Sequence, residues 1–149
     1  MGGGTMDDPL GLRRFEAAQA PVIGRVLDEL RAGRKASHWM WFVFPQIAGL
    51  GLSEMSRRYA IGGIDEARAY LAHPVLGTRL RDCCAVLLGL RDTTARAVFG
   101  AVDEAKLRSC VTLFAAAAGG DGGVFRQVLD RYFAGEADPA TARRLAGGA

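Results

Sequence analysis

The feature of this sequence that most constrains its fold is an alternation along the chain. Short segments with apolar residues at helical spacing alternate with residues that commonly cap helices. Apolar residues recur at helical spacing, for example at Val22, Ile23, Val26, Leu27 and Leu30. Ser, Thr, Asp, Gly and Pro separate such segments, as they separate helices in most proteins. No second segment shows the alternation of a strand that could pair with a first one. We therefore predict an all-α fold.

Individual capping residues set the expected helix boundaries. Asp8-Pro9 and Asp138-Pro139 each place proline directly after a residue favoured at the N-cap. Further N-caps are expected at Ser53, Asp65, Thr93 or Thr94, and Asp103. Connections are short and the composition does not shift along the chain. We therefore predict one helical domain over residues 8–145, with flexible tails at 1–7 and 146–149.

Length and composition exclude several classes of protein. The chain has 149 residues, about one domain, and half of them are hydrophobic, so wholesale disorder is not expected. No apolar run approaches the length of a membrane helix, and no secretory signal precedes the first helix. The cysteines, Cys83, Cys84 and Cys110, are odd in number and show no Cys-x-x-Cys spacing, so we expect reduced thiols and a cytoplasmic protein.

Charge and missing motifs limit the expected partners. Lys and Arg total 19 against 16 acidic residues, a net charge of +3, and the charges are interspersed. Because nucleic-acid-binding proteins usually concentrate basic residues on one face, we expect no nucleic-acid partner. The sequence has no phosphate-binding glycine loop, no dinucleotide fingerprint and no metal-ligand spacing, so we predict no cofactor and no metal site.

Three charged residues fall on apolar helix faces. On a helical wheel, Lys106 lies between Leu113 and Cys110, inside the apolar arc of its helix. Asp103 lies at the middle of this apolar arc. Arg79 falls on the apolar face of the preceding helix. A buried charge needs a partner, so one interpretation is that these residues are structural braces. The other is that Lys106 and Arg79 line a cleft and bind an anionic ligand, with Asp103 positioning the lysine.

The segment Ser37–Phe44 is the densest in aromatic residues and contains both tryptophans. We predict a short buried helix here, because an isolated strand would not be stable. Trp39 and Trp41 are then core anchors or stacking faces beside a pocket. His38 and Gln46 frame the segment with polar groups that could bind a ligand, and a catalytic role for His38 is the alternative to a structural one.

Long stretches of the chain resemble a known family. These stretches are DPLGLRRFEAAQ, SHWMWFVFPQIAGLG, EARAYLAHPVLGTRLRDC, VFGAVDEAKLRSCVTLF and VFRQVLDRYFAGEADPAT. They resemble the bacterial domain of unknown function family 1810, whose members are sometimes labelled calpastatin-like, over about residues 8–142. The resemblance implies a multihelical bundle around a buried central helix and implies no activity. Its characteristic motifs contain all the candidate site residues: His38, Trp39, Trp41, Gln46, Arg79, Asp103, Lys106 and Ser109.

Two functional hypotheses follow. In the first, the domain binds a small anionic, nucleotide-like ligand, and Lys106 and Arg79 contact the negative charge of this ligand. If the domain is an enzyme, the expected reaction is hydrolysis of a glycosidic bond, with Asp103 or His38 as the acid or base. A weaker likeness in helix style to small all-α N-glycosidases transfers no catalytic residue. In the second, the domain is a non-catalytic interaction module and the same charges are braces. Ligand identity and oligomeric state do not follow from the sequence.

Overall fold

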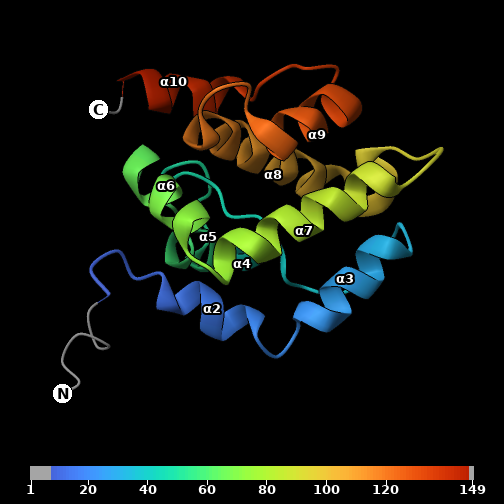
Figure 1. The fold of residues 1–149 in the computed structure, drawn as a ribbon, viewed down its shortest axis with the longest axis horizontal. Coiled ribbons are helices and arrows are strands. Elements are labelled where there is room, and N and C mark those ends of the chain that lie inside the picture. The colour runs from blue at the N-terminus through green and yellow to red at the C-terminus, as the bar shows by residue number, and fades with distance from the viewer. Residues whose placement is uncertain (1–7, 148–149) are drawn as a thin grey trace.

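Residues 8–147 are described by the computed structural model, and this part of the chain forms nine helices (Figure 1). The helices are α2 (Arg13–Gln19), α3 (Ile23–Arg31), α4 (Met40–Val43), α5 (Glu54–Arg58), α6 (Ile64–Ala72), α7 (Leu76–Gly89), α8 (Ala95–Ala118), α9 (Gly123–Phe133) and α10 (Pro139–Gly147). Between residues 8 and 147 there is no strand, and Ile47 and Ile61 form an isolated parallel bridge. The predicted all-α fold is confirmed. Tails are expected at 1–7 and 146–149. Residues 1–7 and 148–149 lie outside the described residues, and Ala146 and Gly147 belong to α10.

Three of the nine described helices begin at capping residues that the sequence indicates. The side chains of Ser53 and Thr94 accept hydrogen bonds from the first turns of α5 and α8, at 3.1 Å and 3.0 Å. Asp138 accepts from the backbone N–H of Thr141 at 2.9 Å and so caps α10. Asp8 also accepts backbone hydrogen bonds at the start of α2, although that helix begins only at Arg13. These local bonds satisfy N–H groups that a helix leaves unpaired.

Three of the expected caps are wrong. The N-cap of α2 is Leu12 and not Asp8. Gly63 is the N-cap of α6, so Asp65 lies in the first turn, where a carboxylate is favoured by the helix dipole. The expected break at Gly100 is confirmed, because α8 (Ala95–Ala118) consists of two helical segments joined at a kink there. Asp103 is not the cap of the second segment, which begins before it. Gly100 has φ 84° and ψ 167°, a conformation that glycine adopts far more readily than other residues. The sequence signals of a helix end and a new start therefore mark a kink.

Helix α8 is the buried central helix of the bundle. In its C-terminal half, Leu107 and the run Ser109–Phe114 are all buried. Figure 1 shows this helix behind α7, with α9 and α10 above it and α6 at one side. Because side chains on every face of Ser109–Phe114 are buried, this part of α8 has almost no polar stripe. The remaining helices cover it, and α2 and α3 lie along the opposite edge of the molecule.

The aromatic segment is buried against this core, as expected from its composition. Met40–Val43 forms the single helical turn α4, and Trp39, Met40, Val43 and Phe44 are each at most 2% exposed. The Trp39 and Phe44 rings both contact Phe99, with centroids 6.5 Å and 5.8 Å away. These contacts attach α4 to the first part of α8, just before the kink. None of the helices between residues 8 and 147 combines the length and apolarity needed to cross a bilayer.

Candidate functional site

Two lysines converge on the carboxylate of Asp103. The Lys35 ammonium lies 2.9 Å from Asp103 Oδ2, and the Lys106 ammonium lies 3.7 Å from Oδ1. The three side chains keep 9%, 21% and 18% of their surface exposed for Lys35, Lys106 and Asp103, respectively. They come from the loop after α3 and from the first turns of α8 beyond its kink. The group is therefore partly buried but open to water.

Each of these lysines also lies over a tryptophan ring. Lys35 Nζ is 5.0 Å from the ring centroid of Trp39, and Lys106 Nζ is 5.2 Å from that of Trp41. Such cation–π contacts help to hold an ammonium group at a site of low polarity. Lys35 and Lys106 are the only lysines of the sequence, which otherwise uses arginine for positive charge, and Trp39 and Trp41 are its only tryptophans. We call Lys35, Trp39, Trp41, Asp103 and Lys106 the lysine–tryptophan cluster.

The two lysines are held very differently. Lys35 donates a hydrogen bond to the carbonyl oxygen of Ser37 at 2.7 Å, and its backbone N–H donates to Val98 at 2.8 Å. Lys106 makes no hydrogen bond to another residue within 8–147, and its contact with Asp103 is long for a charge-assisted one. An ammonium group can donate three hydrogen bonds. Lys35 is therefore fixed, whereas Lys106 keeps its donors available.

Glu29 fixes the loop that carries Lys35 and Trp39. Its carboxylate accepts hydrogen bonds from the N–H groups of Ala36 and Ser37, from the Ser37 hydroxyl and from Trp39 Nε1. Partial burial alone would raise the pKa of Glu29, but the hydrogen bonds from Ser37, Ala36 and Trp39 together lower it to about 2. The carboxylate therefore positions the first tryptophan through its indole N–H.

The kink in α8 positions the other half of the cluster. Because the helix changes direction at Gly100, Asp103 and Lys106 lie in the first two turns after the kink. Arg96 spans the kink, and its Nε and Nη2 donate to Glu104 Oε1 at 3.1 Å and 3.0 Å. The start of a helical segment also carries a partial positive charge, which favours anions nearby.

The charges of the lysine–tryptophan cluster do not cancel. Two ammonium groups share one carboxylate, which leaves an excess of one positive charge. Glu29 is occupied by four donors and forms no ion pair with either lysine. An anion at this surface would therefore find a cation with free donors beside a half-buried indole.

Arg79 belongs to a second group of polar contacts. Its Nη1 donates to Gln19 Oε1 at 3.4 Å, and the Gln19 amide donates to the Phe42 carbonyl at 2.6 Å and to the Tyr70 hydroxyl at 3.0 Å. Gln19 is 1% exposed, and burial raises the pKa of Tyr70 far above its usual value. We call Gln19, Phe42, Tyr70 and Arg79 the glutamine network. It connects α2, α4, α6 and α7 inside the bundle.

The other predicted site residues lie in varied surroundings. Ser109 is buried, and its hydroxyl lies 2.8 Å from that of Thr141, so it connects α8 with α10. His38 is exposed, and its ring has no hydrogen bond to any residue between 8 and 147. Gln46 is half-buried, and its backbone carbonyl accepts from Ile61 at 2.9 Å. The structure brings Trp39, Trp41, Asp103 and Lys106 together and places Arg79 and Ser109 in other contacts.

Lys35 is the residue of the cluster that the sequence analysis missed. It lies in a polar loop where helical periodicity gives no information. The signal that could have found it is the rarity of lysine in an arginine-rich chain, with one lysine only four residues before the first tryptophan.

Hollows on the described surface lie elsewhere. Three of them, of about 410, 460 and 390 Å³, are lined by other residues and not by the lysine–tryptophan cluster. Within residues 8–147, no group of three or more His, Cys, Asp or Glu side chains could hold a metal ion.

Comparison with known proteins gives two findings. A family model described as "Protein of unknown function (DUF1810)" matches residues 9–145. The chain is also similar to the solved structure of the conserved hypothetical protein Rv1873 from Mycobacterium tuberculosis, with 46% sequence identity and a TM-score of 0.91. That similarity covers 93% of this chain and 99% of the mycobacterial one. No curated protein matches the chain.

Proposed function

Because the chain belongs to the DUF1810 family, whose description names no activity, we propose a function from the geometry: the protein binds a small anionic ligand at the lysine–tryptophan cluster. The observation that carries this proposal is the unequal sharing of Asp103. Lys35 takes the short contact at 2.9 Å, and Lys106 is left with one at 3.7 Å. A phosphate or carboxylate group of a ligand would supply the hydrogen-bond acceptors that Lys106 lacks.

The proposed ligand is nucleotide-like, because the cation stands beside an aromatic ring. Trp41 is half-buried, so part of its indole is accessible to a planar group while Lys106 contacts an attached phosphate. His38 and Gln46 remain predicted hydrogen-bond partners of the ligand. Arg79 already donates to the buried Gln19, whereas Lys106 has no hydrogen bond to another residue within 8–147, so we assign the anion first to Lys106.

A thermal-shift screen tests the binding proposal. The wild type would be heated with NAD, ADP-ribose, mononucleotides and sugar phosphates. A ligand at about 100 times its dissociation constant adds about 2.7 kcal/mol of stability, or several degrees for a domain of this size. Lys106→Met should abolish the shift, because it keeps the aliphatic chain on Trp41 and removes the charge. Arg25→Ala, an exposed site on α3, is the charge control and should retain the shift.

The same screen separates this function from the structural alternative. If no compound shifts the wild type and Lys106→Met is strongly destabilised, the cation is a brace and the non-catalytic interaction module is favoured. If a compound shifts the wild type and a folded Lys106→Met equally, the ligand binds elsewhere and the proposal is wrong.

The reaction that we propose for a bound ligand is hydrolysis of a glycosidic bond, in which water replaces the leaving base or sugar. Asp103 is the better-placed acid or base, because its carboxylate is in the cluster and 18% exposed. His38 is the second candidate. Chromatography of wild type incubated with NAD or ADP-ribose should show a released base or sugar, and Asp103→Asn should not release it. Product formation by a folded Asp103→Asn at the wild-type rate would exclude Asp103.

We also propose that the protein works in a reducing compartment such as the cytoplasm. Cys83, Cys84 and Cys110 are buried free thiols, and burial raises the pKa of Cys83 to about 12. Thiols in this state react slowly with oxidants and act as small core residues. Mass spectrometry of the protein isolated from its own cells should find all three reduced.

A further inference from the structure

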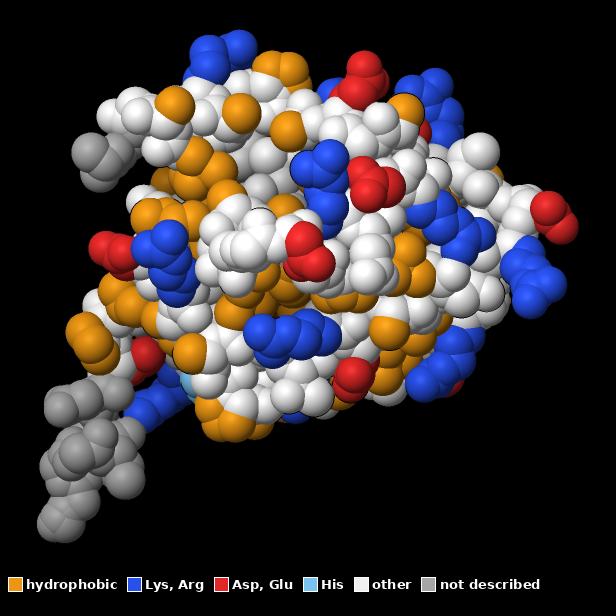
Figure 2. Space-filling view, turned by 45° about the horizontal axis from the view of Figure 1, so that its top comes forward, with side chains coloured by type: hydrophobic (Ala, Val, Ile, Leu, Met, Phe, Trp, Pro, Cys, Tyr) orange, Lys and Arg blue, Asp and Glu red, His pale blue; other side chains and the backbone are white. Residues whose placement is uncertain are grey.

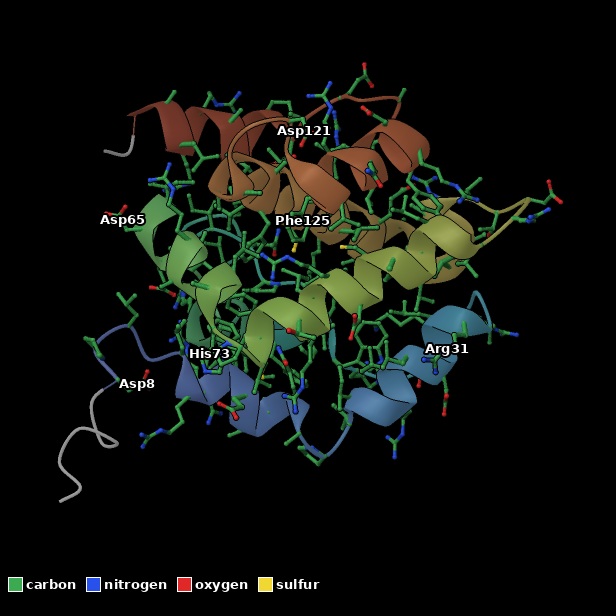
Figure 3. All side chains as sticks on the ribbon, in the orientation of Figure 1. Asp8, Arg31, Asp65, His73, Asp121 and Phe125 are labelled. Atoms are coloured by element: carbon green, nitrogen blue, oxygen red, sulfur yellow. The ribbon has the colours of Figure 1, made fainter. Side chains whose placement is uncertain are left out.

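A second candidate site lies between α6 and α10, away from the lysine–tryptophan cluster. A hollow of about 460 Å³ is walled by Leu10, Ile47, Ile64 and Leu145, with Arg144 at its edge. In Figure 1 the first turn of α6 lies beneath α10, and Figure 3 places Asp65 at that outer edge. On the face that Figure 2 shows, hydrophobic side chains gather between α10, at the upper left, and the elements below it. This volume suits a small ligand with an apolar body.

Arg144 stands between this hollow and a neighbouring one of about 390 Å³, which Gly49, Leu50, Ala140 and Arg143 also line. A Cβ atom at Gly49, whose φ is 97°, would lie within 2.5 Å of the Cζ and both Nη atoms of Arg144. Similar distances to all three atoms mean that the guanidinium plane lies flat on the glycine. Any side chain at position 49 would displace it. Glycine therefore permits the position of the arginine as well as the backbone turn.

The positive charge of Arg144 has no carboxylate partner within residues 8–147. Its hydrogen bond to the Gly49 carbonyl is long, at 3.4 Å. The two acids that line the hollow form other ion pairs: Glu66 pairs with Arg14 at 3.3 Å, and the Asp65 side chain is 96% exposed and lies 3.8 Å from Arg68. The planar guanidinium can still offer several donors to one carboxylate.

We propose that this hollow binds a small organic carboxylate with an apolar body. The apolar part would occupy the space between Ile47, Ile64 and Leu145, and the carboxylate would accept hydrogen bonds from Arg144. The site is independent of the lysine–tryptophan cluster, so the failure of one proposal does not decide the other.

An NMR titration with 3-phenylpropionate tests the proposal. Saturable shifts are expected for the backbone amides of Gly62, Gly63 and Gly49, which line the two hollows. Arg144→Met should weaken binding by about tenfold or more, because it removes a charge-assisted contact and keeps the aliphatic chain. Arg25→Met, at an exposed position on α3 that lines neither hollow, is the charge control and should bind as the wild type does. Lys106→Met should also leave the affinity unchanged.

Two further probes separate the parts of the ligand. The amide of the same acid should bind weakly because it lacks the charge, and acetate should bind weakly because it lacks the apolar body. Leu10→Ser, at a 39% exposed rim position that the fold tolerates, should reduce affinity for the aromatic acid. Equal affinity of acid and amide, an unchanged affinity in a folded Arg144→Met, or no shift at millimolar acid would each overturn the proposal.

Discussion

The lysine–tryptophan cluster and the glutamine network contain the same kind of sequence anomaly, a cation on an apolar helix face, with different outcomes. In the glutamine network, Arg79 donates to Gln19 Oε1 at 3.4 Å. Gln19 is 1% exposed, and its amide donates to Phe42 and Tyr70. In the cluster, Lys106 is 21% exposed and has no hydrogen bond to another described residue. The comparison teaches that a helical wheel can identify a charged residue on an apolar face, which needs a partner or a function. Only the three-dimensional contacts separate a brace from a binding group.

The largest effect is expected in the glutamine network. Gln19→Met would leave the Phe42 carbonyl and the Tyr70 hydroxyl without their partner inside the bundle. Unsatisfied buried groups of this kind should lower the free energy of unfolding by about 2–4 kcal/mol. Urea denaturation would measure the loss, with exposed Gln127→Met as the matched control. A Gln19→Met protein as stable as this control would show that the network is not a brace.

A smaller loss is expected at Glu29, which supports the cluster from inside. Glu29→Gln removes the charge that accepts hydrogen bonds from residues 36, 37 and 39. We expect about 1–2 kcal/mol of destabilisation at neutral pH, measured by urea denaturation. Glu136→Gln, on an exposed connection, is the control.

The pH dependence gives Glu29 a distinct signature. Its pKa in the folded protein is about 2, below the ordinary value of 4.5, so its contribution is fully present above about pH 4.5 and is lost as the pH falls through 2. The stability difference between wild type and Glu29→Gln should therefore shrink over that window. A difference that stays constant between pH 5 and pH 2, in acid unfolding followed by circular dichroism, would contradict this assignment.

The smallest effects are expected for the two lysines, and they should differ. Lys35→Met removes a 2.9 Å ion pair and a 2.7 Å hydrogen bond and should cost about 1 kcal/mol. Lys106→Met should cost less than about 0.5 kcal/mol, because its contact with Asp103 is long and partly exposed. Thermal unfolding of both variants measures the order. A reversed order would make Lys106 the brace and Lys35 the available cation.

The fold was largely predictable because its signals are local. Caps at Ser53, Thr94 and Asp138 satisfy backbone groups within three residues, so the sequence contains the whole interaction. Asp65 and Asp103 were assigned wrongly as caps because Gly63 and the Gly100 kink start those helical segments without a side-chain cap. A glycine before a helix and a glycine after one look alike in a single sequence.

The candidate site was predictable only in part because its contacts are long-range. Asp103 and Lys106 are three residues apart, so helical periodicity places them together. Lys35 contacts the same carboxylate from a loop that α4 to α7 and the start of α8 separate from it in the sequence, and no periodic pattern connects them. Arg144 was missed for a related reason, since only the fold brings Gly49 against its guanidinium.

The most direct test of the lysine–tryptophan cluster uses the scarcity of lysine in this chain. Reductive methylation with ¹³C-formaldehyde labels the lysines and the α-amino group and keeps their charge. The spectrum then contains signals for Lys35 and Lys106, assigned with the two Met variants. On titration with ADP-ribose, then with the other compounds of the screen, we expect a saturable shift of the Lys106 signal and a smaller one of Lys35. If no compound moves the Lys106 signal at millimolar concentration, or if all signals move equally, the cluster is not a binding site.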